Sequence, residues 1–376
     1  MKDSRTLLNY HDLSIEVEDS PSVELMDHMY GTVMGQPGGI QYHHTDLEDR
    51  LKSGHEDYFM FLRKSGKMLG SVGFCGKPAV TAGLKHDSWL IRYFSIKAPI
   101  RGVPKKRKTK AELQDEGKRT TVLGRFIQPV FADPGQLRAE EDRTGKPAII
   151  FATIDRTNLR SMNFSAQMGL ETVGSFAALT FSRLRPKKSE RVEPVEQAQQ
   201  ASILNQIQEF YKDYTLFYSD AIFKNDDYYV IREEGRMVAG VQIYQVTWRI
   251  VDFGDRLTNW AAEVLGWIPG LRKRLNKKEI SFLAFDALYF EQGREKELYE
   301  LLEGVLKQSA NYFGMMMMDL ESELYELFKA HKKLGILHKA MGEKHADIRM
   351  RFIQVPEEVK RQFIKRPTYI PTYDNS

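Results

Sequence analysis

Side chains able to move a proton or attract an anion gather in the first third of the chain. His86 titrates near neutral pH, so it could act as a general base, and it could equally be a surface loop residue. Residues 105–110 carry five positive charges in six positions, which would attract a phosphate, an acidic substrate or RNA. Glu112, Asp115 and Glu116 follow closely, so a solvated loop is an equal alternative. No aromatic residue interrupts the run, so stacking on bases has no support here.

Metal chemistry and covalent catalysis have little support in the sequence. His43 and His44 are adjacent, so their side chains point in different directions, and no His-Glu-x-x-His or Cys-x-x-Cys spacing occurs. Cys75 is the only cysteine and ends an apolar segment, where cysteine is more often a small core residue than a nucleophile. The sequence therefore predicts no metal site and allows no internal disulfide.

The composition indicates a globular chain long enough for two domains. Of 376 residues, 42% are hydrophobic and 28% are charged. The net charge of +4 is too small to argue for nucleic-acid binding by itself, which leaves RNA as an open but disfavoured partner. The longest apolar stretch, residues 260–271, is interrupted and falls short of the roughly 20 residues that span a bilayer. With one cysteine and no apolar leader, the expectation is a soluble protein of the cytoplasm.

Two domains are expected on either side of a linker at residues 186–200, where apolar periodicity gives way to a charged segment containing proline. The first domain, residues 1–185, and the second, residues 201–376, share one order of elements. Apolar patterns predict strands in the first domain at 58–63, 68–74, 89–97, 148–154 and 171–184, and helices at 122–131 and 158–168. The corresponding strands of the second domain are predicted at 228–231, 238–248, 280–289 and 315–318. We predict an α+β fold, with a mixed and mostly antiparallel sheet flanked by helices in each domain.

The segment Thr153–Leu170 carries a similarity to a known family. Asn158 stands at the start of the predicted helix, where its side-chain oxygen can accept from free backbone N–H groups. Gly169 stands at its end, where a positive φ is needed. Together with the element order, this segment resembles the GCN5-related N-acetyltransferases over most of the first domain. The resemblance implies a tandem acyl-CoA N-acyltransferase fold with acetyl-CoA, or another acyl-CoA, as cosubstrate.

A second signature of that family is a loop of small residues before a helix, whose backbone N–H groups hold the pyrophosphate of coenzyme A. Residues 114–119 stand in its register. Arg119 replaces the last small residue there, and its guanidinium could contact phosphate. By this resemblance, the cofactor-binding residues are Phe94, Ser95, Ile96, Lys97, Arg101, Gln114, Gly117, Lys118, Arg119, Thr120 and Asn158.

Acetyl transfer by direct attack needs a base for the incoming ammonium, donors for the oxyanion and an acid for the departing thiolate. The resemblance places the acid at Ser165, where the family often has a tyrosine, and the base near the central strand, at His86 or Tyr93. The acceptor would be a primary amine of a small molecule or peptide. Two alternatives stay open, namely a catalytically silent binding protein and an aminoacyl-tRNA-dependent transferase in which the basic loop binds RNA.

The second domain is expected to bind no coenzyme A. Residues 290–298, which follow its central strand, contain one glycine and three acidic side chains that would repel a pyrophosphate. An aromatic and basic insertion at 260–278 could cover an acyl chain or lie on a membrane surface, with packing on its own domain as the alternative. The sequence leaves the acceptor amine and the oligomeric state open.

Overall fold

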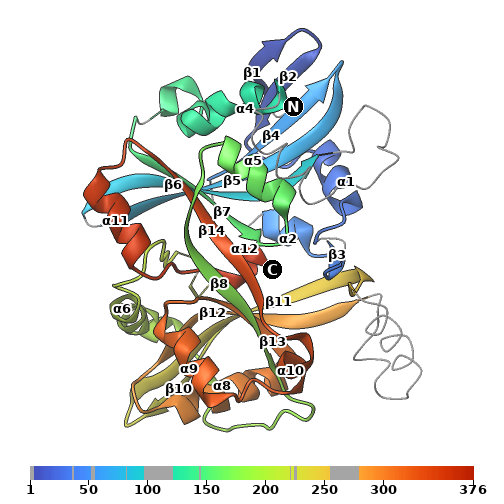
Figure 1. The fold of residues 1–376 in the computed structure, drawn as a ribbon. Coiled ribbons are helices and arrows are strands. Elements are labelled where there is room, and N and C mark those ends of the chain that lie inside the picture. The colour runs from blue at the N-terminus through green and yellow to red at the C-terminus, as the bar shows by residue number, and fades with distance from the viewer. Residues whose placement is uncertain are drawn as a thin grey trace. The chain divides into compact units, whose positions relative to one another are not determined.

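Two compact units make up the chain, and each combines separate stretches of sequence. The computed structural model describes residues 4–35, 38–51, 56–81, 83–96, 122–143, 145–220, 222–223, 227–254 and 279–376. Unit 1 comprises Met1–Thr32, Leu47–Gly174 and Ala346–Lys365, and unit 2 comprises Val33–Asp46, Ser175–His345 and Arg366–Ser376. Figure 1 shows this interleaving by colour, because the red strand β14 (Lys344–Ile353) lies beside the green strand β7 (Ala148–Asp155).

Unit 1 is built on a mixed sheet in the order β1-β2-β4-β5-β6-β7-β14. Its pairs are antiparallel except β6–β7, which is parallel. The remaining strands are β1 (Arg5–Tyr10), β2 (Leu13–Glu18), β4 (Glu56–Lys64), β5 (Lys67–Thr81) and β6 (Leu84–Ile96). The helices are α1 (Val23–Gly31), α2 (Leu47–Leu51), α4 (Val122–Ala132), α5 (Leu159–Gln167) and α11 (Glu357–Lys365), with 3-10 turns at Pro134–Leu137 and Glu140–Asp142.

Both faces of the unit 1 sheet are covered, because strand β4 is apolar on both sides. Successive side chains of a strand point to opposite faces. Met60 and Leu62 pack with helix α4 in one core cluster, whereas Phe59 and Phe61 pack with helices α1 and α2 in another. Strand β4 therefore separates a face that carries α4 from a face that carries α1 and α2.

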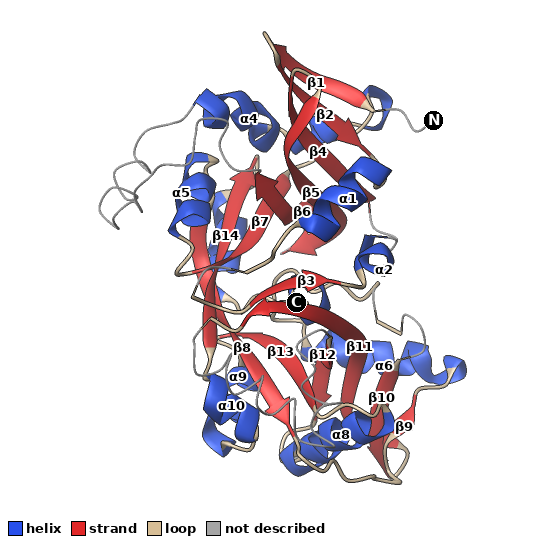
Figure 2. Cartoon of the chain, turned by 90° about the vertical axis from the view of Figure 1, so that its right-hand side faces the viewer, coloured by secondary structure: helices blue, strands red, loops and turns tan. Residues whose placement is uncertain are grey.

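Unit 2 has a sheet in the order β8-β13-β12-β11-β10-β9, and β3 (Gln41–His44) pairs with the far end of β11. The pair β12–β13 is again parallel. The strands are β8 (Glu171–Ser182), β9 (Glu193–Pro194), β10 (Tyr228–Glu233), β11 (Arg236–Asp252), β12 (Ile280–Phe290) and β13 (Phe313–Asp319). The helices are α6 (Gln200–Phe210), α8 (Glu295–Gln308), α9 (Glu323–His331), α10 (Ile336–Met341) and α12 (Thr372–Asn375), with a 3-10 turn at Gln197–Gln199. Figure 2 shows the sheet in red and its helices in blue.

The unit boundaries differ from the predicted division at 186–200. Val192 and Val195 are buried in the core of unit 2, and Glu193–Pro194 forms its edge strand β9. A proline lacks the N–H that a central strand needs, yet it is tolerated at a sheet edge. The boundary falls after Gly174, inside β8, and residues 346–365 return to unit 1. The charged segment is thus part of a folded unit.

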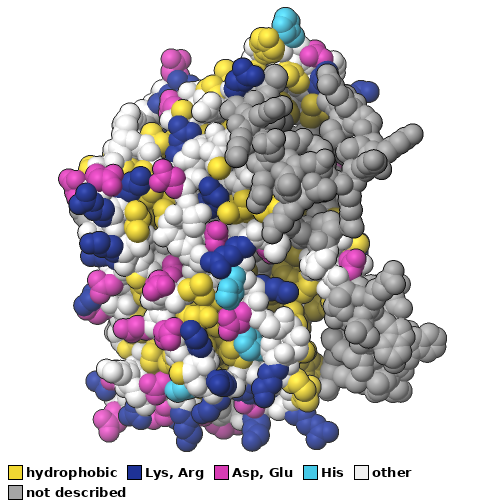
Figure 3. Space-filling view, in the orientation of Figure 1, with side chains coloured by type: hydrophobic (Ala, Val, Ile, Leu, Met, Phe, Trp, Pro, Cys, Tyr) yellow, Lys and Arg dark blue, Asp and Glu magenta, His cyan; other side chains and the backbone are white. Residues whose placement is uncertain are grey.

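The surface has mixed charge. On the face shown in Figure 3, Lys and Arg side chains are interspersed with Asp and Glu over most of the area, and Lys and Arg are frequent near the lower edge. In the part of the chain that the structure describes, no helix is long and apolar enough to cross a membrane. The same part holds no group of three or more His, Cys, Asp or Glu side chains able to bind a metal ion.

Candidate functional site

A bulge interrupts strand β6 of unit 1. Gly73 of β5 pairs with Arg92, and Ser71 pairs with Ser95, so Tyr93 and Phe94 together face the single residue between them on β5. Tyr93 has a φ of 54°, in the left-handed region that non-glycine residues seldom adopt. A bulge removes its extra residue from the ladder, and strain of this kind is found where backbone groups are aimed at a ligand. The backbone at positions 93–95 is therefore the first element of the candidate site.

Strands β6 and β7 diverge just before the bulge. Among the described residues, their parallel pairing joins Asp87–Leu90 to Ala148–Phe151 and goes no further. Strand β6 nevertheless continues to Ile96, and β7 to Asp155. The bulge thus lies in the part of β6 that follows its last parallel pair with β7.

An apolar cavity lies beside this bulge. It contains about 310 Å³ of empty space, counted together with the solvent at its mouth. The rings of Phe94 and Phe164 stack within it, with centroids 4.7 Å apart, and Phe131 meets Phe164 edge to face. No lining residue is charged; the ten are Met60, Leu62, Gly70, Ser71, Val72, Phe94, Ser95, Ile127, Phe131 and Phe164. The cavity suits an apolar group attached to whatever the bulge binds.

Helix α5, which supplies Phe164, is fixed at both ends. The Asn158 side-chain oxygen accepts from the Ser161 N–H at 3.0 Å, and Gly169 has a φ of 78°, so both expected helix-end roles are confirmed. At the other end, Arg351 donates to the Met168 carbonyl at 2.7 Å and Arg349 to that of Leu170 at 2.5 Å. Two arginines from β14, far away in sequence, thus hold the end of the helix that shapes the cavity.

Three residues were predicted to act catalytically, and only Tyr93 lies at the bulge. Its own ring packs under the Arg92 guanidinium, 4.7 Å from the ring centroid. Ser165 is buried on α5 and donates its hydroxyl to the Met162 carbonyl of its own helix at 2.9 Å. That hydroxyl is already used within the helix, so the geometry gives it no role as an acid.

His86 is placed away from the bulge. It stands seven residues before Tyr93 on β6, roughly 20 Å along an extended strand. Its ring is 1% exposed, with Nε2 3.1 Å from the Thr81 hydroxyl and Nδ1 3.3 Å from that of Ser88. Burial lowers the pKa of His86, which keeps the imidazole neutral at pH 7. Its surroundings are those of a satisfied core histidine.

The predicted cofactor residues divide into two groups. Phe94 and Ser95 lie at the bulge and line the cavity, and Ile96 ends β6. Asn158 caps α5. Outside the described residues lie Lys97, Arg101, Gln114, Gly117, Lys118, Arg119 and Thr120, together with the basic run 105–110 and the insertion 260–278.

The glycines of strand β5 are a sequence signal for the bulge. Strand β5 contains Gly70, Gly73 and Gly76, and glycine within a strand often marks a bulge or a close approach. A Cβ at Gly73 would lie 3.3 Å from the Tyr93 ring and 3.4 Å from the Arg92 carbonyl oxygen. The glycine at position 73 therefore leaves room for the bulge opposite.

Unit 2 repeats the bulge. Gly240 of β11 pairs with Tyr289, and Gln242 with Asp286, so Ala287 and Leu288 face one residue. Ala287 has a φ of 44°. In both units the left-handed residue comes three positions after the last parallel pair, which involves Leu90 in unit 1 and Ala284 in unit 2. This shared offset is structural support for an internal repeat.

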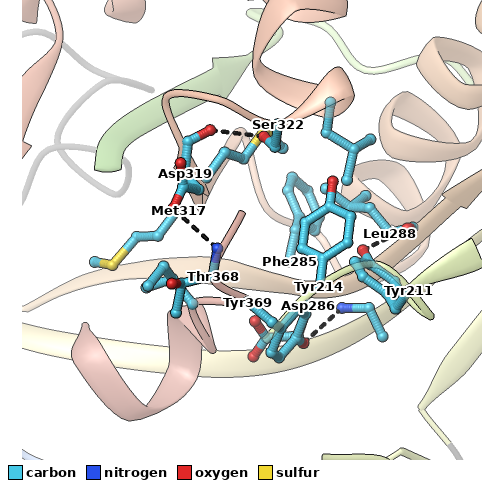
Figure 4. A pocket seen from close by; sticks show the side chains of 14 residues that line it. Tyr211, Tyr214, Phe285, Asp286, Leu288, Met317, Asp319, Ser322, Thr368 and Tyr369 are labelled. Atoms are coloured by element: carbon cyan, nitrogen blue, oxygen red, sulfur yellow. Dashed lines mark hydrogen bonds between the residues drawn. The ribbon is translucent and has the colours of Figure 1, made fainter. Parts of the chain in front are cut away.

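The second bulge is occupied by the chain itself. The Ala287 N–H donates to the Tyr369 hydroxyl oxygen at 3.0 Å, and the Thr368 N–H donates to the Asp319 carboxylate at 2.9 Å (Figure 4). Asp286 accepts from the backbone N–H groups of Thr372 at 2.6 Å and of Tyr373 at 3.1 Å. Residues 366–376 thus contact both β12 and β13. We call them the C-terminal plug.

A cavity remains beside the plug, with about 320 Å³ of empty space including the solvent at its mouth. Its lining includes the carboxyl groups of Asp286 and Asp319 and the rings of Tyr211, Tyr214 and Tyr369 (Figure 4). Burial raises the pKa of Asp286 to about 7. The cavity of unit 2 is thus acidic and aromatic, in contrast to the uncharged cavity of unit 1.

Comparisons with known proteins place the fold. No family model matches the chain, and no curated protein matches its sequence. A structure of Saccharomyces cerevisiae N-myristoyltransferase with bound myristoyl-CoA matches with a TM-score of 0.56 at 8% identity, over 97% of this chain and 86% of that chain. Another structure of the same enzyme, with bound myristoyl-CoA and inhibitors, matches with a TM-score of 0.56 at 9% identity, over 94% of this chain and 84% of that chain. A GCN5-related N-acetyltransferase from Sphaerobacter thermophilus matches with a TM-score of 0.43 at 12% identity, over 82% of this chain and 86% of that chain.

At such low identities the likeness shows the fold alone. N-myristoyltransferase has a tandem-like GNAT fold, which agrees with the bulged mixed sheet in each unit and with the repeat between them. The predicted fold is therefore confirmed: this chain has the tandem GNAT-like fold of N-myristoyltransferase.

Proposed function

We propose that this protein is an acyl-CoA-dependent N-acyltransferase whose reaction takes place at the β6 bulge of unit 1. The observation that carries the proposal is the position of an uncharged cavity directly beside backbone that has left the sheet ladder. A thioester has both features that this arrangement suits, namely a polar carbonyl group and an attached apolar chain. The likeness to N-myristoyltransferase, solved with myristoyl-CoA, supports the same assignment.

The bulge would act on the thioester through hydrogen bonding. Backbone N–H groups at the bulge can donate to the thioester carbonyl oxygen, and these bonds strengthen as negative charge develops there. The amine nitrogen attacks the carbonyl carbon, and a C–N bond forms as the C–S bond breaks. The ammonium loses a proton, and the departing thiolate gains one. This route needs no covalent intermediate on the protein.

The acyl group transferred is proposed to be longer than acetyl. Seven large apolar side chains line the cavity, among them Phe131, Ile127 and Leu62. An acetyl group would leave most of that apolar surface uncovered. A longer acyl chain would cover it, and each methylene buried there would contribute roughly 0.8 kcal/mol to the binding free energy. The acceptor is proposed to be a primary amine, of a peptide or a small molecule.

The proposal is tested by calorimetric titration of the full chain with acetyl-, octanoyl- and myristoyl-CoA, followed by assays of thiol release with peptide amines. We expect binding that tightens from acetyl to a longer acyl chain, and amine-dependent release of CoA. Binding without turnover of any amine would favour a silent binding protein. No binding of any acyl-CoA would overturn the proposal.

Narrowing the cavity should change the choice of acyl chain. Val72 lines the cavity on β5 and is buried, so Val72→Phe fills space that a long chain would occupy. We expect affinity for the longest acyl-CoA that binds to fall at least tenfold, with little change for acetyl-CoA. Val80→Phe makes the same replacement at an exposed position of β5 and should leave both unchanged. An equal loss for all chain lengths would contradict the assignment of this cavity to the acyl group.

A further inference from the structure

We propose that residues 329–345 of unit 2 form a docking surface for an anionic lipid bilayer. This segment runs from the end of α9 through α10 to the start of β14, and we call it the α9–α10 surface. It contains five lysines, three histidines and one acidic residue, Glu343. Its formal charge is +4, from five lysines and one glutamate.

The lysines of this surface are available to an outside partner. Lys332, Lys339 and Lys344 are exposed, and none of them forms an ion pair with a residue that the structure describes. Glu343, the one acidic residue of the segment, lies 3.1 Å from His345 and accepts from the Tyr325 hydroxyl at 3.0 Å. Lys329 is held 3.5 Å from Glu326, which leaves the others as the exposed cations.

Exposed aliphatic side chains lie among these cations. Ile336 begins α10 and is 57% exposed, and Met341 ends it. Leu184 is 64% exposed, two residues beyond Ser182, whose hydroxyl accepts from the Leu337 N–H at 3.1 Å. Lysines attract lipid phosphates while aliphatic groups enter the boundary between headgroups and acyl chains. The combination of both types at one place favours a lipid surface.

Nucleic acid fits the same charge less well. Residues 329–345 contain no Phe, Tyr or Trp, and of the three histidine rings that of His331 already stacks on Tyr299, with centroids 5.9 Å apart. Its exposed apolar groups would also gain nothing from a phosphate backbone. RNA binding is therefore treated as the competing outcome in the test.

The test is co-sedimentation of the full chain with vesicles of phosphatidylcholine containing 30% phosphatidylserine, with pure phosphatidylcholine as the reference. We expect binding to the anionic vesicles that weakens with added salt. Lys339→Glu with Lys344→Glu should lower the partition coefficient at least tenfold. Ile336→Asp should lower it at unchanged lysine content.

Lys67→Glu with Lys85→Glu is the matched control, because it makes the same charge change at exposed positions of unit 1. This control should keep wild-type vesicle binding, and acyl-CoA affinity should be the same in all variants. Equal vesicle binding by the two double variants, or none by the wild type, would overturn the proposal. RNA binding that is lost in Lys339→Glu with Lys344→Glu, without vesicle binding, would assign the surface to nucleic acid.

Discussion

Replacing Tyr369 with alanine should destabilise unit 2 by about 3 kcal/mol, because the residue fills space and also satisfies a buried donor. Its ring packs edge to face against Tyr211 and Phe217, with centroids 5.2 and 5.0 Å away. Its hydroxyl accepts from Ala287, a residue 1% exposed whose N–H stands in the bulge and would be left without that acceptor. The measurement is urea unfolding, together with hydrogen exchange of peptides from β12.

Tyr369→Phe separates the two contributions. It keeps the ring and removes only the acceptor of the Ala287 N–H, so we expect a loss of about 1–2 kcal/mol and faster exchange at the bulge. Tyr10→Ala removes a tyrosine that is 56% exposed in unit 1 and should leave the exchange of β12 unchanged. If Tyr369→Phe is indistinguishable from wild type at β12, the hydrogen bond does not hold the plug in place.

The stability of unit 2 should decrease as the pH rises from about 4 to about 7. Burial raises the pKa of Asp286 from 3.8 to about 7, so the folded state binds a proton that the unfolded state has released in this range. Stability from the protonated carboxyl is fully present below the unfolded pKa and is lost as the pH passes the folded pKa. A difference of about three pKa units corresponds to about 4 kcal/mol.

Asp286→Asn tests this titration. The amide cannot release a proton. The difference in unfolding free energy between wild type and variant should therefore change by about 4 kcal/mol between about pH 4 and about pH 7. The variant itself will be less stable at low pH, because one of the two N–H groups, from Thr372 or Tyr373, meets an NH2 group. Asp213→Asn at an exposed position should follow the wild-type curve. A constant difference between wild type and Asp286→Asn would show that Asp286 does not titrate in this window.

Local sequence patterns were sufficient to predict most of the sheet and the ends of helix α5. Apolar runs predicted β7 and β12 within about two residues, and the residue types of Asn158 and Gly169 define the helix ends. These features depend on neighbours in the chain, which is why one sequence reveals them. The predicted mixed sheet follows from the same patterns.

The candidate site depends on pairings between distant segments, and these were not predictable. The bulge at Tyr93 is visible only once β5 and β6 are in register, because φ is set by the pairing and not by the tyrosine itself. Similarly, Arg349 and Arg351 carry no sequence mark that assigns them to the end of α5. The residue type of His86 and its position near the central strand predict a base, and neither reveals that two hydroxyl groups already engage its ring.

The pairing of β14 with β7 also constrains how this protein matures on the ribosome. Residues 148–155 are made long before residues 346–353, which join them edge to edge over eight pairs. At synthesis rates of 5–20 residues per second, the partner strand emerges roughly 10–40 s later. Until then β7 lacks this neighbour, and an unpaired strand edge is a site for aggregation. Unit 1 therefore completes its sheet only after nearly all of unit 2 has been translated.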